Sequence, residues 1–435
     1  MKKKSATLWL ALALGAADAS AQQWTLDSCV AYAVDHNMEI RQQALRVRDG
    51  ELSITEAKDR FLPNVDASAS QSFNFGRGLT AENTYANRNT SSTQWNVGFN
   101  LPLFQGLSEY SRLKAARLSL KQYLLETESA KDNLTLNIIS QYLQVLYNKE
   151  IARSARSQAE LSKFEVERQK AMVEAGKVAE ATLYDVESVA AQDRLQVVTA
   201  DNDIQTALVT LANMMHLDRI DGFDVAPLEG DDGILPTPDD VYRSALGINN
   251  SLLGLRQAVK VAEENIFLAK TGYIPTLSFN GGLGSSYYTV AGIPSEGFAG
   301  QMRHNFSTYL GFSLRIPIFD SFSTRNSVRR AKIQKLNAEL QLEQRETDLY
   351  KDIRLAYYQA TGAKERWLTS GETLEKARLS FEATRERFNL GRATQADYEQ
   401  AKNNLFKTET VGIQAHYEYL IRKRILLFYS TPSER

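Results

Sequence analysis

The sequence predicts an α+β protein that is mainly α, in which pairs of amphipathic strands interrupt very long helices. Four segments alternate apolar and polar residues with period 2, the pattern of strands whose two faces meet different surroundings. Between them, long stretches without helix breakers carry apolar stripes at helical spacing, in a chain of 435 residues with only nine prolines. The order helix, strand, strand, helix, helix occurs twice, which predicts a duplicated repeat.

Residues 1–21 have the features of a secretory signal peptide. Lys2, Lys3 and Lys4 precede a short apolar run, and Ala19-Ser20-Ala21 is a small-x-small cleavage pattern. We therefore expect the mature chain to begin at Gln22. No later stretch approaches the roughly 20 apolar residues of a membrane-spanning helix. The mature chain is expected in the periplasm, outside the cell, or in the outer membrane as a barrel.

Charge and residue content exclude several classes of function. A formal net charge of −1 gives a nucleic-acid partner no electrostatic support. The sequence has no Gly-rich phosphate loop and no Gly-x-Ser-x-Gly motif, and its histidines are scattered without metal-ligand spacing. We therefore predict no enzymatic activity, no catalytic or metal-binding residues and no cofactor. The histidines are His36, His216, His304 and His416.

Cys29 is the only cysteine, which rules out an intrachain disulfide. It lies well beyond the expected cleavage site, so no lipid modification is predicted there. Its place on a helix favours a small buried residue over a reactive thiol.

The two halves of the chain repeat the same landmarks at a separation of about 212 to 215 residues. The pairs are Leu26–Val30 and Pro238–Val241, Phe61–Asn64 and Tyr273–Thr276, Leu101–Phe104 and Ile316–Phe319, and Ala175–Lys177 and Leu390–Arg392. We expect a first structural repeat at 22–216, an acidic linker containing Gly and Pro at 217–240, and a second repeat at 241–435. The first helix of each repeat is expected over about 26–60 and 238–272.

The expected strands lie at about 64–77 and 93–102 in the first repeat, and at about 276–287 and 308–317 in the second. Their apolar positions include Val65, Ala67, Phe73, Trp95, Val97, Phe99, Leu277, Phe279, Leu283, Leu310, Phe312 and Leu314. The alternate positions hold mainly Ser, Asn and Gly with few charges, which suits the wet lumen of a barrel whose outer face meets lipid. The connecting segments are polar and contain glycine, as outward-facing loops should.

A soluble sandwich with one buried face is the alternative for these strands, because it would show the same alternation. Four strands are too few for a sandwich. They are also too few to close a barrel, which needs about eight strands even for an interior filled by side chains. An open lumen therefore requires several protomers.

The chain has no proline or glycine from Leu107 to Ala175. This predicts a helix over about 107–174, roughly 100 Å long at 1.5 Å per residue. Apolar residues form matching stripes in this helix and in its counterpart in the second repeat. The stripes are Leu134, Ile138, Tyr142, Val145 and Leu146, and Leu349, Ile353, Ala356, Tyr357 and Ala360.

The two shorter helices of each half add to roughly 110 Å, so each half can form two parallel struts of equal length. Gly176 and Gly391 suit the left-handed position that ends a helix, which predicts tight helix turns far from the strands. A coiled-coil scaffold or stalk is the alternative for such helices. It does not explain why amphipathic strands interrupt each helix pair.

Taken in order, these motifs resemble the TolC family of outer-membrane efflux proteins. The resemblance rests on the signal peptide, Phe-Leu-Pro-Asn and Tyr-Ile-Pro-Thr before strands, Leu-Pro-Leu-Phe and Ile-Pro-Ile-Phe before long helices, and the Gly-Lys and Gly-Arg turns. It covers nearly all of the mature chain. It implies a homotrimer in which a 12-stranded outer-membrane β-barrel continues into a long periplasmic α-helical barrel. Segment 217–240 and the C-terminal end would form an equatorial belt.

The resemblance also implies a function and its partners. The trimer would be a passive duct that contacts outer-membrane lipid, a periplasmic adaptor (membrane fusion) protein and an inner-membrane pump. We expect multidrug or small-molecule efflux. A duct for type I protein secretion is one alternative, and a soluble coiled-coil envelope stalk or scaffold is an alternative of a different class.

In this family the periplasmic helix turns meet the adaptor. The matching residues here are Ala175, Gly176, Lys177, Val178, Leu390, Gly391, Arg392 and Ala393. The same residues also have a simpler interpretation as helix caps, and the two roles are compatible.

The resemblance further implies a constricted periplasmic mouth with inward side chains, including acidic rings. Asp397 and Gln400 fall on acidic positions of the family, while Phe388 replaces a tyrosine and Ala393 an arginine. In the first half Thr182 occupies a position where the family can have an acid, and Asp185 is nearby. Three symmetry-related carboxylates would raise each other's pKa and attract cations. The alternative for Asp397 is a solvated acid favoured by the dipole of its helix start.

Overall fold

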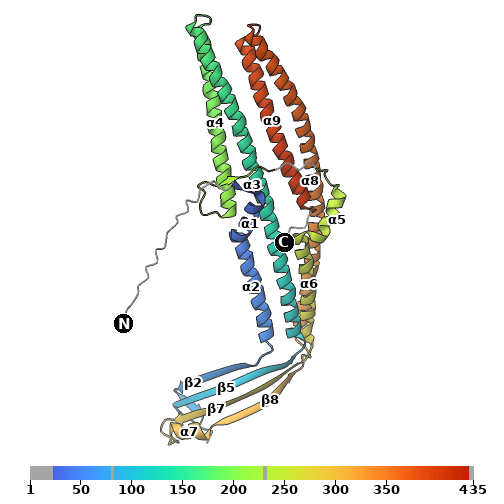
Figure 1. Cartoon of the computed structure of the whole chain (residues 1–435). Helices are drawn as coiled ribbons and strands as arrows, with labels where there is room; N and C mark the ends of the chain where they lie inside the picture. The colour runs from blue at the N-terminus through green and yellow to red at the C-terminus, as the bar shows by residue number, and fades with distance from the viewer. Residues whose placement is uncertain (1–22, 80–82, 229–232, 431–435) are drawn as a thin grey trace, which may run out of the picture. The chain divides into compact units, whose positions relative to one another are not determined.

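The computed structural model describes residues 23–79, 83–228 and 233–430 (Figure 1). The expected signal peptide, residues 1–21, and the expected first mature residue lie outside them. The strands are β1 Gln23–Trp24, β2 Asn64–Asn74, β3 Arg77–Leu79, β4 Tyr85–Asn87, β5 Thr90–Gln105, β6 Asp224–Val225, β7 Thr276–Val290 and β8 Ser307–Arg315. The helices are α1 Leu26–His36, α2 Met38–Asp59, α3 Ser108–Glu174, α4 Glu180–Met215, α5 Pro238–Ile248, α6 Asn250–Lys270, the 3-10 turn η1 Thr271–Tyr273, α7 Phe298–His304, α8 Ser323–Asn389 and α9 Gln395–Phe428.

The chain forms two compact units, and each takes segments from both halves of the sequence. Unit 1 runs up to Arg41 and also takes Lys131–Ser244 and Asp352 onward. Unit 2 takes Gln42–Ala130 and Ala245–Lys351. The two sequential repeats therefore describe the order of motifs along the chain. That each repeat is also a structural domain stays a prediction.

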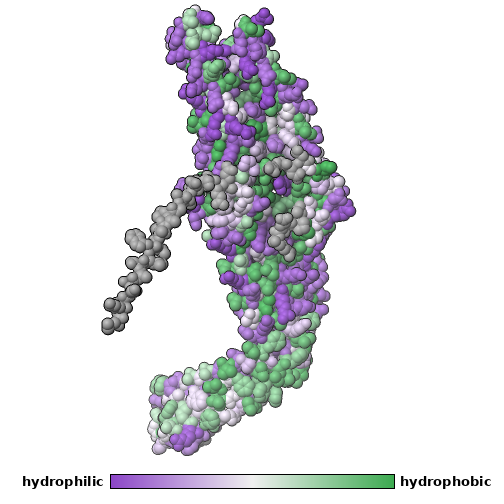
Figure 2. Space-filling model, in the orientation of Figure 1, coloured by the Kyte–Doolittle hydropathy of each residue, from purple (hydrophilic) through white to green (hydrophobic). Residues whose placement is uncertain are grey.

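Unit 2 contains an antiparallel sheet of four strands in the order β2-β5-β7-β8. The register aligns Val65 with Phe99, Phe99 with Gly281, and Gly281 with Leu310. Opposite residues of paired strands share a face, so the apolar positions of all four strands gather on one side. Figure 2 shows hydrophobic residues over the visible part of this sheet and hydrophilic ones gathered at its loop end.

Aromatic rings pack side by side on this apolar face. The ring centroids of Phe99 and Phe279 are 5.4 Å apart, and those of Phe279 and Phe312 are 4.9 Å apart. A Cβ at Gly281 would lie 2.7 Å from Phe99 Cε1 and 2.5 Å from Leu310 Cδ2, so a larger residue here would require these side chains to shift. The other face carries the Ser, Asn and Gly residues that the alternation predicts.

The segments that connect the paired strands are structured. The first contains the short antiparallel pair β3 and β4, and the second contains helix α7. The sequence predicted polar, glycine-containing loops here and did not predict these elements.

The helical part of unit 2 is held by polar contacts as well as by packing. Glu264 of α6 accepts a hydrogen bond from Ser111 Oγ at 2.7 Å and pairs with Lys114 Nζ at 2.7 Å, both on α3. The hydrogen bond and charge of Glu264 raise the pKa of Lys114. Because Gly50 of α2 has no side chain, the ring of Tyr123 in α3 can approach the backbone of α2 closely. Across the described helices of both units, none is long and apolar enough to cross a membrane.

Unit 1 has an apolar core built mainly from α1, α3 and α4. The apolar core consists of Leu26, Cys29, Ala33, Ile138, Ile139, Tyr142, Leu143, Val145, Leu146, Ala207, Leu208, Leu211, Ala212, Met215, Phe223, Val225 and Leu420. Cys29 is fully buried, as its sequence context suggested, and burial raises the pKa of its thiol to about 12.

The N-terminal strand β1 is fastened to the segment after α4. It pairs in parallel with β6. The buried hydroxyl of Tyr142 lies 3.0 Å from the carbonyl oxygen of Trp24 and 2.7 Å from that of Ala226, so one side chain joins both segments. Lys149 Nζ adds a bond to Val225 O at 2.9 Å and an ion pair with Asp224 at 2.5 Å.

Candidate functional site

The turn between α3 and α4 has the hydrogen bonds of a Schellman motif. Gly176 N donates to Val173 O at 2.8 Å, and Lys177 N donates to Met172 O at 2.9 Å. Gly176 has φ +68°, in the left-handed region that glycine enters without a steric penalty. The helix therefore ends where the sequence predicts a glycine stop.

The turn between α8 and α9 repeats this geometry. Gly391 N donates to Phe388 O at 2.9 Å, and Arg392 N donates to Arg387 O at 2.7 Å. Gly391 also has φ +68°. The two turns are thus equivalent in backbone as well as in sequence, and Figure 1 shows one at the end of each helical hairpin.

The helices that follow the two turns begin differently. At the start of α4 the N-cap residue is Ala179, which has no side-chain cap. At the start of α9 Thr394 and Asp397 form a capping box. Thr394 Oγ1 accepts from Asp397 N at 3.1 Å, and Asp397 Oδ2 accepts from Thr394 N at 2.9 Å. Thr394 Oγ1 also donates to Asp397 Oδ2 at 2.7 Å. This bond and the one from Thr394 N lower the pKa of Asp397 below its ordinary value of 3.8, so the carboxyl is ionised at neutral pH.

Most residues expected to meet an adaptor are exposed at the two turns. The exposed ones are Ala175, Gly176, Lys177, Leu390, Gly391 and Arg392, and the partly buried ones are Val178 and Ala393. Leu390 is 69% exposed. The turns present backbone, two cations and one apolar side chain to their surroundings.

The residues expected at the gate divide into two groups. Asp397 and Gln400 of α9 and Asp185 of α4 are exposed, and Thr182 of α4 is partly buried. Phe388 is instead partly buried, with its ring packed on Tyr398 of α9. The structure does not bring Phe388 and Asp397 into one cluster, because the carboxylate of Asp397 is engaged with its own helix start.

Phe388 belongs to a buried cluster that joins α3, α8 and α9. Its ring stacks on Tyr398 with centroids 4.9 Å apart, and the guanidinium of Arg168 lies 4.5 Å from its centroid. Tyr398 OH donates to Glu165 Oε1 at 3.1 Å, and Glu165 pairs with Arg168 at 2.8 Å. Burial, followed by the charge of Glu165, raises the pKa of Tyr398.

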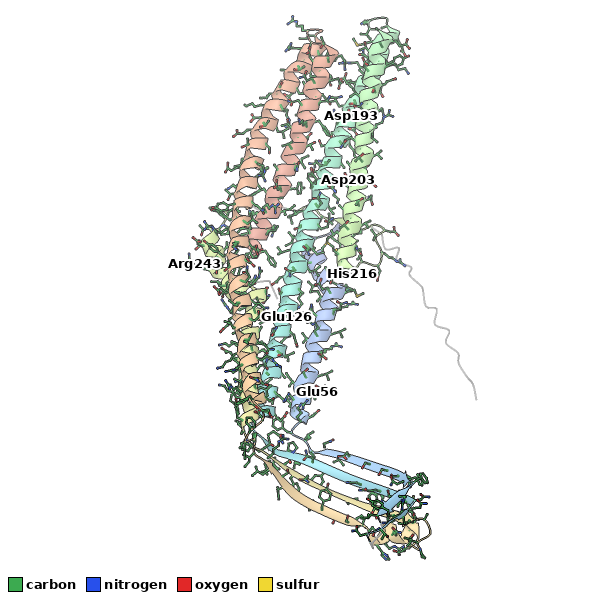
Figure 3. The ribbon with its side chains drawn as sticks, turned by 180° about the vertical axis from the view of Figure 1, so that it is seen from behind. Glu56, Glu126, Asp193, Asp203, His216 and Arg243 are labelled. Atoms are coloured by element: carbon green, nitrogen blue, oxygen red, sulfur yellow. The ribbon has the colours of Figure 1, made fainter. Side chains whose placement is uncertain are left out.

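A second buried cluster lies one helical turn further along α9. Lys402 is 1% exposed, and its Nζ is 2.7 Å from Glu399, 2.9 Å from Ser162 Oγ and 3.7 Å from Asp193. Ser162 also donates to Asp193, which extends from α4 (Figure 3). This cluster therefore joins α3, α4 and α9 through a buried cation.

Both clusters sit on a stripe of buried polar residues along α3, which we call the polar seam. Its members are Ser154, Gln158, Ser162, Glu165 and Gln169, each at most 9% exposed. Their spacings of four, four, three and four residues keep them on one helix face. Sequence reasoning missed these residues because it followed apolar stripes. The same heptad-like spacing of polar residues was the signal that could have found them.

The chain matches the profile of a known protein family along most of its length. The family is described as outer membrane efflux protein, and the matched residues are 31–215 and 241–428. The two matched segments contain both helix turns and all four strands of the main sheet.

Individual proteins show the same similarity at low sequence identity. Outer membrane protein TolC of Escherichia coli (strain K12) is 23% identical over 436 residues, covering 97% of this chain and 85% of that protein. Outer membrane efflux protein BepC of Brucella suis is 22% identical over 409 residues, covering 93% and 84%. The crystal structure of outer membrane protein VceC from Vibrio cholerae matches with a TM-score of 0.76 at 13% identity, covering 94% and 97%. That last similarity concerns the fold.

Proposed function

The chain belongs to the outer membrane efflux protein family, and from this premise we propose that it is the outer-membrane channel of a tripartite export system. Membership of this family makes it a channel protein of the outer membrane with a periplasmic helical portion, not an enzyme. The finer proposal is a passive duct that receives its cargo from an inner-membrane pump through a periplasmic adaptor.

The observation that carries the proposal is the sheet of unit 2. Within the described part of the chain, the outer strands β2 and β8 each pair on one side only. An unpaired sheet edge is a template for pairing with another chain. Three copies would contribute 12 strands and close a barrel without edges. Leu310, Phe312 and Leu314 are each more than 60% exposed on the apolar face, where lipid would cover them. A soluble stalk would leave this face in water.

Small-molecule efflux is the cargo class that we propose. It is supported by the efflux function named for the family and for relatives such as BepC. The polar face of the sheet, rich in Ser, Asn and Gly, suits a wet, non-selective pore and does not discriminate between small molecules and other cargo.

The two helix turns are the proposed contact with the adaptor. Their support is the repeated Schellman geometry, which presents the same backbone shape twice per chain and therefore six times in a trimer. The exposed Leu390 would supply an apolar contact, and Lys177 and Arg392 would supply matching cations, one at each turn.

We place the gate at the helix start that carries Asp397. Its carboxylate is exposed and ionised, and a threefold axis would bring three of them into one ring. Such a ring would hold cations at the periplasmic mouth. The capping box fixes each carboxylate in position.

The proposed function is tested by planar-bilayer conductance of the detergent-purified mature protein, with its oligomeric mass measured in the same preparation. A trimer that gives small, mostly closed channels is the expected result. A soluble particle without conductance would overturn the channel proposal and favour the coiled-coil stalk.

The gate is tested in the same bilayers with two matched variants. Asp397→Asn removes the charge but keeps an acceptor oxygen for the cap, whereas Thr394→Ala removes the cap but keeps the charge. We expect Asp397→Asn to raise conductance or weaken block by multivalent cations, and Thr394→Ala to have a smaller effect. Unchanged block in Asp397→Asn would remove this residue from the gate.

A further inference from the structure

Helix α7 lies on only one face of the sheet in unit 2. The register pairs Ser285 with Trp95 and Leu283 with Val97, so Ser285 points to the apolar face. This polar side chain is only 4% exposed. Its Oγ donates to the carbonyl oxygen of Met302 in α7 at 2.7 Å. The backbone of α7 therefore covers the apolar face at this point.

Two aromatic contacts extend this packing at both ends of α7. The rings of Phe298 and Tyr287 meet edge to face with centroids 5.1 Å apart. Phe306, which follows α7, has its ring centroid 6.4 Å from that of Trp95. Tyr287 is two residues from Ser285 on the same strand and shares its face. All these contacts are made on the apolar side.

Side-chain amides hold α7 against β7 where β8 stops pairing. The last ladder partners of the two strands are Gly284 and Ser307. Beyond them, Gln301 of α7 donates to Tyr288 O at 3.0 Å and accepts from Tyr288 N at 2.9 Å, as a neighbouring strand would. Asn305 Nδ2 adds a bond to Ser286 O at 2.7 Å. The helix is thus fixed in place by the strand edge.

This anchored segment exposes large apolar side chains. Ile293 is 59% exposed, Phe298 53% and Phe306 51%. The segment lies at the end of β7 that is remote from α6, since α6 and η1 lead directly into the first residues of that strand. In an outer-membrane protein with periplasmic helices, this end of the sheet belongs to the outer leaflet.

We propose that α7 and its flanking residues form an interfacial anchor, in which Phe298 and Phe306 contact the lipid of the outer leaflet. The apolar sheet face continues directly into these side chains, so the lipid that covers the face would cover them as well. Aromatic rings are the side chains that favour the boundary between acyl chains and headgroups. The proposal rests on the proposed function, because it requires the apolar face to meet lipid.

Site-directed spin labelling of the full chain in phosphatidylcholine vesicles tests the anchor. The native Cys29, which is buried, is first replaced by alanine. Single cysteines are then introduced in separate proteins by Phe298→Cys, Phe306→Cys, Tyr288→Cys and Leu310→Cys. Tyr288 is a matched control at the same level on the opposite face. Leu310 lies on the apolar face within the sheet and reports whether that face meets lipid at all. The measurement is the ratio of oxygen to nickel-chelate accessibility.

We expect the ratio at residues 298 and 306 to be several-fold higher than at 288 and below that at 310. A ratio at 298 and 306 equal to that at 288, with a high ratio at 310, would overturn the anchor and leave the channel intact. A low ratio at 310 as well would overturn the proposed function itself. Two labelled positions keep the test valid if one variant fails to fold.

Discussion

Unit 1 contains two stretches of α3 that are buried in opposite ways. Around Ile138 and Leu146 the helix faces the apolar core, whereas from Ser154 to Gln169 it buries the polar seam. The apolar core is stabilised by removal of hydrocarbon from water, which does not depend on direction. The polar seam depends on hydrogen bonds and ion pairs of defined geometry, and each buried group without its partner is costly.

The two kinds of burial constrain the arrangement of the helices differently. An apolar core tolerates small shifts because its contacts are many and weak. A polar seam has few discrete partners, so it specifies one arrangement of helices and loses stability abruptly when that arrangement breaks. The seam lies on the stretch of α3 that leads to its helix turn, the end of the helices at which we propose the gate.

The largest effect is expected from a cavity in the apolar core. Leu211 of α4 is fully buried, and Leu211→Ala should lower the free energy of unfolding by about 4 kcal/mol, because the lost methyl groups leave a void. Denaturant titration followed by circular dichroism measures this. The control is Thr199→Ala on the exposed face of the same helix, expected within about 0.5 kcal/mol of the parent. Equal losses in the two variants would contradict the core assignment.

A somewhat smaller effect is expected when the polar seam loses its cation. Lys402→Met should lower the free energy of unfolding by about 3 kcal/mol, because Glu399 and Asp193 are left partly buried without their counter-charge. The same titration measures it.

The double variant Lys402→Met with Glu399→Gln tests the cause of that loss. The second substitution removes the uncompensated charge of Glu399, so the double variant should recover a large part of the lost free energy of unfolding. If Lys402→Met alone is as stable as the parent protein, the seam is solvated and the contrast with the apolar core fails.

The smallest effect is expected at the two helix starts. Thr394→Ala should cost about 1 kcal/mol because it removes the capping box of α9. Ala179→Ser should add up to about 1 kcal/mol at the start of α4, which has no side-chain cap and whose Ala179 already has extended backbone angles. Amide hydrogen exchange in the first turn of each helix separates the two effects. Opposite signs at the two sites are required.

The capping box also predicts a pH dependence with a definite sign. The pKa of Asp397 is lower in the folded protein than its ordinary value of 3.8, so its contribution is complete above that value. It is lost as the pH falls through the lowered pKa. Exchange protection at the start of α9 should therefore be constant from neutral pH to about pH 5 and decline in stronger acid. Thr394→Ala should weaken this dependence, because it removes the hydroxyl bond to the Asp397 carboxylate and keeps the backbone one.

Local patterns predicted most of the fold correctly. The helix expected over 107–174 is observed as α3, Ser108–Glu174, because a long absence of breakers and one glycine are sufficient to begin and end it. The strands are observed close to their expected positions, because period-2 alternation has only one backbone solution. The equivalent turns at Gly176 and Gly391 followed from a single residue type.

The clusters and the loop helix could not be predicted in this way. Glu165 and Lys402 are more than 230 residues from their hydrogen-bond partners Tyr398 and Ser162, and charged residues on a helix are normally exposed. Helix α7 has only seven residues, includes Gly300 and owes its position to Gln301 and the free edge of β7. Such short helices have little stability of their own.

The amino-acid sequence was sufficient to predict the amphipathic strands, the long helices, the glycines that end them and the family to which the chain belongs. These features depend on interactions within a few residues, where the order of side chains is also their order in space. Only the packing of distant segments buries Lys402 among carboxylates and lays α7 on the apolar face. Each of these depends on which element packs beside which, and the energy of a polar or aromatic group changes with its neighbours far more than with its own segment.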